Sequence, residues 1–228
     1  MSGPRIALIH ALEESVLPIR AAFARGWPEA QGFDLLDTSL AVDLADAGQL
    51  DAAMIARFQI LAGYAATIKG KSGTAQAILF TCSAFGPAIE AVKARLPIPV
   101  MRPNEAAFDR ALDLGERLAL VVTFAPSLPS LSAELQAMAA ARGRAVTLTP
   151  VLATGALAAL KAGNGAEHDR LVAEACADIP PQDAVVLGQF SLARAAKVLR
   201  PLFDCPVLTT PDCAVEALKA RLDPRSPT

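Results

Sequence analysis

Two stretches of the chain, "ILFTCSAFGPAIEAVKARLPIPVMRPNEAAFDRAL" at residues 78–112 and "VVLGQFSLARAAKVLRPLFDCPVLTTPDCAVEALK" at residues 185–219, form an internal repeat. They align without a gap at an offset of 107 residues, so Pro99 matches Pro206 and Val100 matches Val207. Identities are few, but each stretch contains an apolar strand, a helical segment, a Pro-Val strand and a second helical segment. The repeat predicts a protein made of two similar halves.

Short apolar or β-branched runs alternate with alanine-rich helical segments along the whole chain. This alternation is typical of βαβ units and of a mainly parallel sheet. The segments "RIALIHALEES" from Arg5 and "RLALVVTFAPS" from Arg117 also resemble each other. We therefore predict an α/β protein of two pseudo-symmetric Rossmann-like lobes with mainly parallel sheets and an active-site cleft between the lobes. The first lobe is expected at 1–102 plus 207–228 and the second at 103–206. The expected strands are 5–10, 33–36, 75–81, 100–101, 117–124, 145–151, 184–187 and 207–209.

Composition limits what the chain can bind. Of its 228 residues, 53% are hydrophobic and 19% are charged, which is enough apolar material for a large core. The formal net charge is −2 and no run of Lys or Arg occurs, so nucleic acid is excluded as a partner. No uncharged apolar stretch reaches membrane-spanning length, so we expect a cytoplasmic protein with no membrane partner. The apolar surface that this composition implies favours a homodimer or a higher homo-oligomer.

The cysteines and histidines do not form a metal site in the sequence. The four cysteines are scattered without a C-x-x-C pair, and the two histidines lack a metal-ligand spacing. We therefore expect free thiols, no disulfide framework and no metal. Cys176 falls in a helical pattern and Cys205 precedes a proline, so both are interpreted as packing residues.

The segment "AILFTCSAFGP" at residues 77–87 places a thiol where an apolar strand ends and a helical pattern begins. Unpaired N–H groups and the helix dipole at such a position would lower the pKa of Cys82 and make it a nucleophile or an acid/base. The alternative is a small buried residue without a chemical role. The hydroxyls of Thr81 and Ser83, with the backbone N–H groups of Ser83 and Ala84, could bind a carboxylate, or they could cap a helix. Under the repeat, Cys82 corresponds to Gln189, and these two are expected to face each other across the cleft.

The segments "ILFTCSAFGPAI", "VVLGQFSLARA" and "RLALVVTFAPSLPSL" together resemble the aspartate/glutamate/hydantoin racemase superfamily, which includes arylmalonate decarboxylase and maleate isomerase. The resemblance implies two α/β lobes, no cofactor, and one catalytic cysteine at the corresponding strand end of each lobe. One thiolate of such a pair removes the proton next to a carboxylate, and the other thiol returns a proton on the opposite face. Cys82 matches the first cysteine, but the second position reads Gly188-Gln189. An amide does not exchange protons near neutral pH, so Gln189 is expected to act as a hydrogen-bond donor.

The resemblance also assigns binding residues in the second lobe. Thr123 matches a hydroxyl-bearing strand end that helps to bind carboxylate, and Phe124 would supply an apolar wall beside it. His10, at the end of the first strand, also points toward the expected cleft, either as a substrate contact or as an ordinary polar group. Phe85, Phe124 and Phe190 together suggest a substrate that carries an apolar substituent.

Several functions fit these patterns. The first is a cofactor-independent racemase-like or isomerase-like enzyme that uses Cys82 at the carbon next to a carboxylate of a small substrate. A single-cysteine decarboxylase of the arylmalonate type is the runner-up, because only one of the two cysteines is present. A non-catalytic carboxylate-binding protein is a further alternative, as is a hydrolase with Cys82 as nucleophile and His10 as base. Cys213 could also supply a second thiol, although the repeat aligns it with Ala106, one element away from the expected site.

Overall fold

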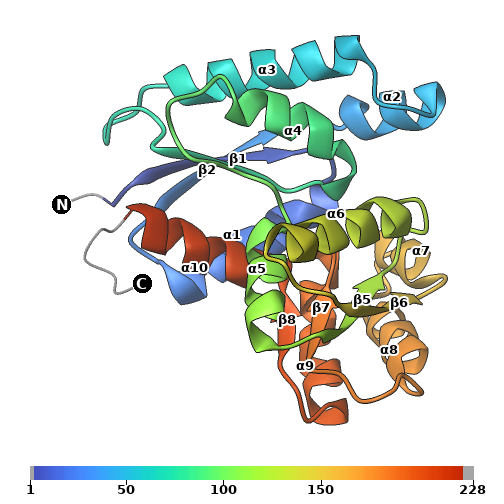
Figure 1. Cartoon of the computed structure of the whole chain (residues 1–228). Coiled ribbons are helices and arrows are strands. Elements are labelled where there is room, and N and C mark those ends of the chain that lie inside the picture. The colour runs from blue at the N-terminus through green and yellow to red at the C-terminus, as the bar shows by residue number, and fades with distance from the viewer. Residues whose placement is uncertain (1–2, 223–228) are drawn as a thin grey trace. The chain divides into compact units, whose positions relative to one another are not determined.

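Two parallel sheets of four strands organise the chain (Figure 1). The computed structural model describes residues 3–222. By their internal contacts these residues fall into two units. The first unit holds the described residues up to Pro103 and from Ala214 onward, and the second unit is Asn104–Cys213. The α/β class and the mainly parallel sheets predicted from the sequence are confirmed.

The first unit contains a sheet with the strand order β2-β1-β3-β4, in which every pair is parallel. Helices α2, α3 and α4 lie on one side of this sheet and α1 and α10 on the other (Figure 1). Its strands are β1 (Arg5–His10), β2 (Gln31–Leu36), β3 (Ala77–Phe80) and β4 (Val100–Met101). Its helices are α1 (Val16–Gly26), α2 (Ser39–Ala47), α3 (Ala52–Thr67) and α4 (Gly86–Lys93), with the short 3-10 helices η1 (Glu13–Ser15) and η2 (Ser83–Phe85). The C-terminal helix α10 (Thr210–Leu222) belongs to this unit from Ala214 onward.

The second unit has the same sheet topology, with the strand order β6-β5-β7-β8. Its strands are β5 (Arg117–Val122), β6 (Thr147–Leu152), β7 (Ala184–Leu187) and β8 (Val207–Thr209), and its helices are α5 (Glu105–Leu114), α6 (Ser127–Ala141), α7 (Ala156–Lys161), α8 (Gly165–Cys176) and α9 (Ala196–Leu199), with the 3-10 helices η3 (Phe190–Ala195) and η4 (Arg200–Leu202).

The internal repeat corresponds to equivalent strands of the two sheets. β3 and β7 have the same bounds after the shift of 107 residues, and β4 begins at Val100 where β8 begins at Val207. β1 and β5 are the central strands that pair with β3 and β7, as the likeness of the segments from Arg5 and Arg117 suggests. The repeat predicted from the sequence is therefore a repeat of strand order.

The boundary between the units differs from the prediction. Residues 207–209 were expected in the first lobe, together with the rest of 207–228, but β8 pairs with β7 and belongs to the second sheet. The second unit extends from Asn104 to Cys213 instead of from 103 to 206. The physical reason is that a strand takes its place from backbone pairing. The chain completes the four strands of the first sheet before it enters the second unit, and the helix that follows β4, α5, packs against β7 and β8 of the second unit.

The core of the first unit follows from strand alternation. Ala7 and Ile9 of β1 and Ile78 and Phe80 of β3 belong to the buried cluster that α2, α3 and α4 cover. Within it the ring of Phe58 in α3 packs against Phe80 and Phe85 at centroid distances of 5.3 and 4.7 Å. Successive side chains of a strand point to opposite faces, so residues 6, 8 and 10 of β1 point to the α1 side.

Candidate functional site

Polar side chains meet at the carboxyl ends of β1 and β3. His10 ends β1, and Thr81 directly follows β3, where its backbone N–H donates to Ile9 O at 3.0 Å. Asp34 of β2 lies opposite Leu8, two residues before His10, so both project from the same face of the sheet. The parallel register therefore brings residues from positions 10, 34 and 81 together, and Cys82 is the next residue of the chain.

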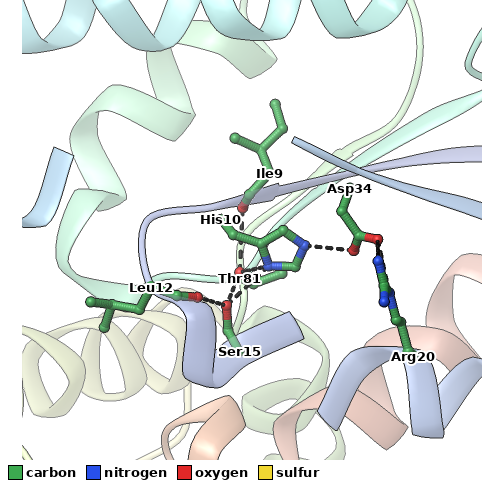
Figure 2. A network of polar contacts seen from close by, with 7 residues as sticks. All are labelled: Ile9, His10, Leu12, Ser15, Arg20, Asp34 and Thr81. Carbon is green, nitrogen blue, oxygen red and sulfur yellow. Dashed lines mark hydrogen bonds and ion pairs between the residues drawn. The ribbon is translucent and has the colours of Figure 1, made fainter. Parts of the chain in front are cut away.

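His10 is completely buried, and its Nε2 lies 2.9 Å from Asp34 Oδ1 (Figure 2). Arg20 of α1 donates from Nε to the other oxygen of the same carboxylate at 2.9 Å. Burial lowers the pKa of His10 from its ordinary value, and the nearby charge of Arg20 acts in the same direction, whereas the hydrogen bond and the charge of Asp34 raise it. The net shift is downward, so His10 is neutral near pH 7, with its Nε2 hydrogen donated to Asp34.

The Nδ1 atom of His10 faces two hydroxyl groups. Thr81 Oγ1 lies at 2.8 Å and Ser15 Oγ at 3.0 Å, and the two oxygens are 2.9 Å apart. Ser15 donates to Leu12 O at 2.7 Å (Figure 2). Both ring nitrogens of His10 thus contact protein groups. His10 was predicted to contact the substrate; in the structure it is buried on the α1 side of the sheet, where it contacts Thr81.

Cys82 is partly buried and is a free thiol. Its backbone is extended (φ −116°, ψ 125°) and precedes the three-residue 3-10 helix η2, while α4 begins only at Gly86. Burial raises the pKa of Cys82 to about 11, although a hydrogen bond from the Ala84 backbone N–H acts in the opposite direction. The prediction of a lowered thiol pKa is therefore wrong, because the loss of solvation outweighs the single N–H group that reaches the sulfur. Cys82 rests as a protonated thiol.

The neighbours of Cys82 differ in their capacity to bind a ligand. Thr81 is 5% exposed, and its hydroxyl already contacts His10 and Ser15, so it has no free hydrogen-bonding capacity for a carboxylate. The Ala84 N–H points to the sulfur. Ser83 is partly buried, and its hydroxyl has no hydrogen-bond partner among residues 3–222. Of the two hydroxyls predicted to bind a carboxylate on this loop, the Ser83 hydroxyl is the one that no other described side chain engages.

The second unit carries Gln189 at the repeat position of Cys82, directly after β7 and Gly188. Gln189 Oε1 accepts from the backbone N–H of Thr123 at 2.7 Å and from its hydroxyl at 2.8 Å. Because a backbone N–H can only donate, this contact fixes the amide with its oxygen toward Thr123 and its NH₂ group pointing elsewhere. Thr123, expected to bind carboxylate, instead donates its hydroxyl hydrogen to Gln189. The NH₂ hydrogens of Gln189 have no acceptor within the part of the chain that the structure describes.

The three phenylalanines that suggested an apolar substituent on the substrate differ in their exposure. Phe85 and Phe190 are 0% and 2% exposed and belong to the interior, whereas Phe124, which follows Thr123, is 43% exposed. Phe85 and Phe190 are buried because the first turn after each strand directs the aromatic ring into the interior, so Phe124 is the one of the three that is exposed. Cys176 and Cys205 pack against the core of the second unit, as predicted.

The residues that surround His10 carry no motif in the sequence. Asp34 lies within a strand, and Ser15 and Arg20 lie in and after η1, so none of them belongs to a recognisable motif. The available signal was an acidic residue in the middle of an apolar strand, "GFDLL", which has to find a partner if it is half-buried. Among residues 3–222 no group of three or more His, Cys, Asp or Glu side chains could hold a metal ion, and no helix is long and apolar enough to span a bilayer.

The fold and these strand-end residues define a parallel α/β protein of two repeated units. A family model described as Asp/Glu/Hydantoin racemase matches residues 35–218, so the chain belongs to the Asp/Glu/hydantoin racemase family, whose racemases are isomerases. The resemblance noted in the sequence is thereby confirmed. A comparison with curated protein sequences finds no match.

Solved structures share the fold at low sequence identity. The aspartate racemase of Picrophilus torridus superposes with a TM-score of 0.72 at 10% identity, over 96% of this chain and 94% of that protein. An allantoin racemase of Pseudomonas fluorescens gives 0.67 at 17% identity, over 96% and 91% of the two chains. A glutamate racemase isoform of Bacillus anthracis gives 0.68 at 11% identity, over 99% and 84%. At these identities the likeness establishes the fold.

Proposed function

We propose that the protein is a cofactor-independent enzyme that uses Cys82 to transfer a proton at the carbon next to a carboxylate of a small substrate. The observation that carries the proposal is the placement of a free, partly buried thiol at the carboxyl end of β3, in a chain of the racemase family. In open parallel sheets, ligands bind outside the carboxyl ends of the strands. The Ser83 hydroxyl is the proposed carboxylate ligand on the same loop.

Gln189 supports chemistry that depends on one thiol. Its oxygen is held by Thr123, which leaves the NH₂ group as the only part of the side chain that can address a ligand, and it can only donate hydrogen bonds. We expect this NH₂ group to donate a hydrogen bond to a carboxylate or to an enolate. It does not serve as the second acid/base of a two-thiol racemase.

A decarboxylase is the second candidate, and the resting state of Cys82 favours it. A thiol with a pKa of about 11 is protonated at pH 7.5, so forming the thiolate that starts a racemisation costs about 5 kcal/mol unless the substrate lowers that pKa. Decarboxylation starts differently. The bond between the α-carbon and a carboxylate breaks, carbon dioxide leaves, and the electron pair stays as an enolate. The Cys82 thiol then donates its proton to that carbon, and solvent reprotonates the thiolate.

The test is an NMR assay in D₂O with a panel of amino acids, hydantoins, maleate and arylmalonates. Exchange of the α-hydrogen with change of configuration identifies a racemase, and a product one carboxyl group smaller identifies a decarboxylase. Cys82→Ala should lose at least the 10²–10⁴-fold that a positioned acid/base contributes. Cys205→Ala, which also removes a partly buried free thiol, is the matched control and should retain activity.

A second variant tests the role of Gln189. Gln189→Cys supplies the thiol that this position lacks, and it should create or raise racemisation of a chiral carboxylate. Full activity of Cys82→Ala on the substrate found would refute the proposal and make the thiol a packing residue. Absence of turnover with every member of the panel, combined with saturable binding, would favour a carboxylate-binding protein.

A further inference from the structure

The polar contacts around His10 Nδ1 outnumber the donor hydrogens that are available to form hydrogen bonds there. Five close contacts link His10 Nδ1, the two hydroxyls and two backbone carbonyls. They are His10–Thr81 at 2.8 Å, His10–Ser15 at 3.0 Å, Ser15–Thr81 at 2.9 Å, Ser15 to Leu12 O at 2.7 Å and Thr81 to Ile9 O at 3.3 Å. With Nδ1 unprotonated, only the two hydroxyl hydrogens are available to fill them. Which acceptor receives each of these two hydrogens therefore determines how the Ser15 and Thr81 hydroxyls are oriented.

The shortest contacts settle that choice. A carbonyl can only accept, so Ser15 gives its hydrogen to Leu12 O. The remaining hydrogen, on Thr81, has His10 Nδ1 at 2.8 Å as its nearest pure acceptor, closer than Ile9 O. Nδ1 is an acceptor only because Asp34 takes the hydrogen at Nε2, which fixes the tautomer of the ring. Asp34 and Arg20 thus determine, through the imidazole, where the Thr81 hydroxyl points.

We propose that His10 is a positioning residue for Cys82: held by Asp34, it accepts the Thr81 hydroxyl hydrogen and thereby fixes the end of β3 from which the thiol projects. Thr81 is tied twice to β1, by its backbone N–H to Ile9 O and by its side chain to His10. Cys82 continues the same extended backbone, so a rotation at Thr81 would redirect the sulfur. The inference rests on the proposed function, because positioning matters for catalysis only if Cys82 reacts.

Protonation of His10 at Nδ1 would rearrange these hydrogen bonds. A hydrogen on Nδ1 would turn the contact with Thr81 around, so that the ring donates and Thr81 must pass its own hydrogen to Ser15 or Ile9 O. The charged groups that act on the ring come from two neighbouring elements, Asp34 of β2 and Arg20 of α1. η1 adds the acidic residues Glu13 and Glu14 beside Ser15. Neutral His10 holds one arrangement of Thr81, and protonated His10 requires another.

Two substitutions separate positioning from packing. His10→Asn keeps an acceptor oxygen near the place of Nδ1, loses the contact with Asp34 and does not titrate. His10→Leu fills the space with no acceptor. The reactivity of Cys82 toward 4,4′-dithiodipyridine, measured without substrate by mass spectrometry of its peptide, reports how the thiol is held. Cys205 in the same molecule is the internal reference, so the ratio of the two rates cancels the pH dependence of the reagent.

The expected ratio depends on both variant and pH. In the wild type it should be constant between about pH 7 and pH 8, where both thiols are protonated because burial raises their pKa values, and it should rise as the pH falls below 6.5 and His10 takes up a proton. In His10→Asn it should stay flat at the wild-type value. In His10→Leu it should be flat but raised about ten-fold, the equilibrium value of one buried hydrogen bond. A ratio in His10→Asn as high as in His10→Leu, or a wild-type ratio that ignores pH, would overturn the proposal.

Two further measurements test the proposal. The first does not require a folded variant, and the second distinguishes a failure of the positioning role from a failure of the proposed function. Nitrogen NMR of wild-type protein labelled at histidine should show a neutral His10 ring with its hydrogen on Nε2 at pH 7.5, and a hydrogen on Nδ1 would contradict the accounting. With a substrate in hand, His10→Leu should lower kcat about ten-fold with KM unchanged, while His10→Asn retains kcat. A wild type that turns over nothing, yet shows the thiol response, refutes the proposed function and leaves the network intact.

Discussion

Replacement of Thr81 by valine should destabilise the protein, whereas the same replacement at Thr210 should not. Both threonines are buried, with exposures of 5% and 0%. The Thr81 hydroxyl contacts His10 and Ser15, whereas Thr210 Oγ1 has no hydrogen-bond partner among the described residues. The substitution removes the same atoms from two sites that differ in hydrogen bonding.

The expected magnitudes follow from that difference. Thr81→Val removes a hydrogen bond worth about 1 kcal/mol and leaves His10 Nδ1 short of a donor, which costs about 2 kcal/mol more. The added methyl group returns about 0.8 kcal/mol. The free energy of unfolding should therefore fall by about 2 kcal/mol. Thr210→Val removes a buried hydroxyl that nothing satisfies, so it should raise the free energy of unfolding by about 1–2 kcal/mol.

Urea unfolding at pH 7.5, followed by far-UV circular dichroism, measures both changes as shifts of the midpoint at unchanged slope. Thr81→Ser is a second control, since it keeps the hydroxyl and loses only a methyl group, and it should cost about 1 kcal/mol. The reasoning is refuted if Thr81→Val is no more destabilising than Thr210→Val. That result would mean that the hydroxyl contacts around His10 contribute nothing measurable.

Three more outcomes are expected. Burial lowers the pKa of His10 in the folded protein below the value of 6.5 in the unfolded chain, so the unfolded state takes up the proton first. The contribution of neutral His10 to the free energy of unfolding should therefore be complete above pH 6.5 and be lost, by at most about 1.4 kcal/mol per pH unit, as the pH falls from 6.5 to the folded pKa. A wild-type curve of stability against pH that matches the curve of His10→Asn would contradict this expectation. Phe58→Ala should cost about 3–5 kcal/mol in urea unfolding because the ring packs against Phe80 and Phe85, and a loss below 1 kcal/mol would exclude it as a core anchor. Alkylation of Cys82 by iodoacetamide should still be increasing with pH at pH 10, since its thiol pKa is about 11, and a plateau near pH 8 would show that burial does not control the thiol.

The sequence determined the architecture because the architecture depends on local pattern. Apolar runs of strand length, separated by helical segments, already specify parallel βαβ units. The 107-residue offset also identifies β7 as the repeat equivalent of β3, and β8 as that of β4. The family and the strand-end position of Cys82 also follow from short segments that are continuous in the chain. The prediction that residues 207–209 belong to the first lobe was wrong, because the residues of a strand do not specify which neighbouring strand it pairs with.

Only the tertiary structure decided the chemistry of the site. The pKa of Cys82 is set by how much solvent the folded chain removes, which no local motif encodes, and the helix-start position pointed in the wrong direction. The network of His10 joins residues 10, 34 and 81 through the register of three neighbouring strands. The orientation of the Gln189 amide is fixed by a backbone N–H that lies 66 residues away. Hydrogen bonds and solvation depend on atoms a few ångströms apart in space, so they become readable only once the strands are paired.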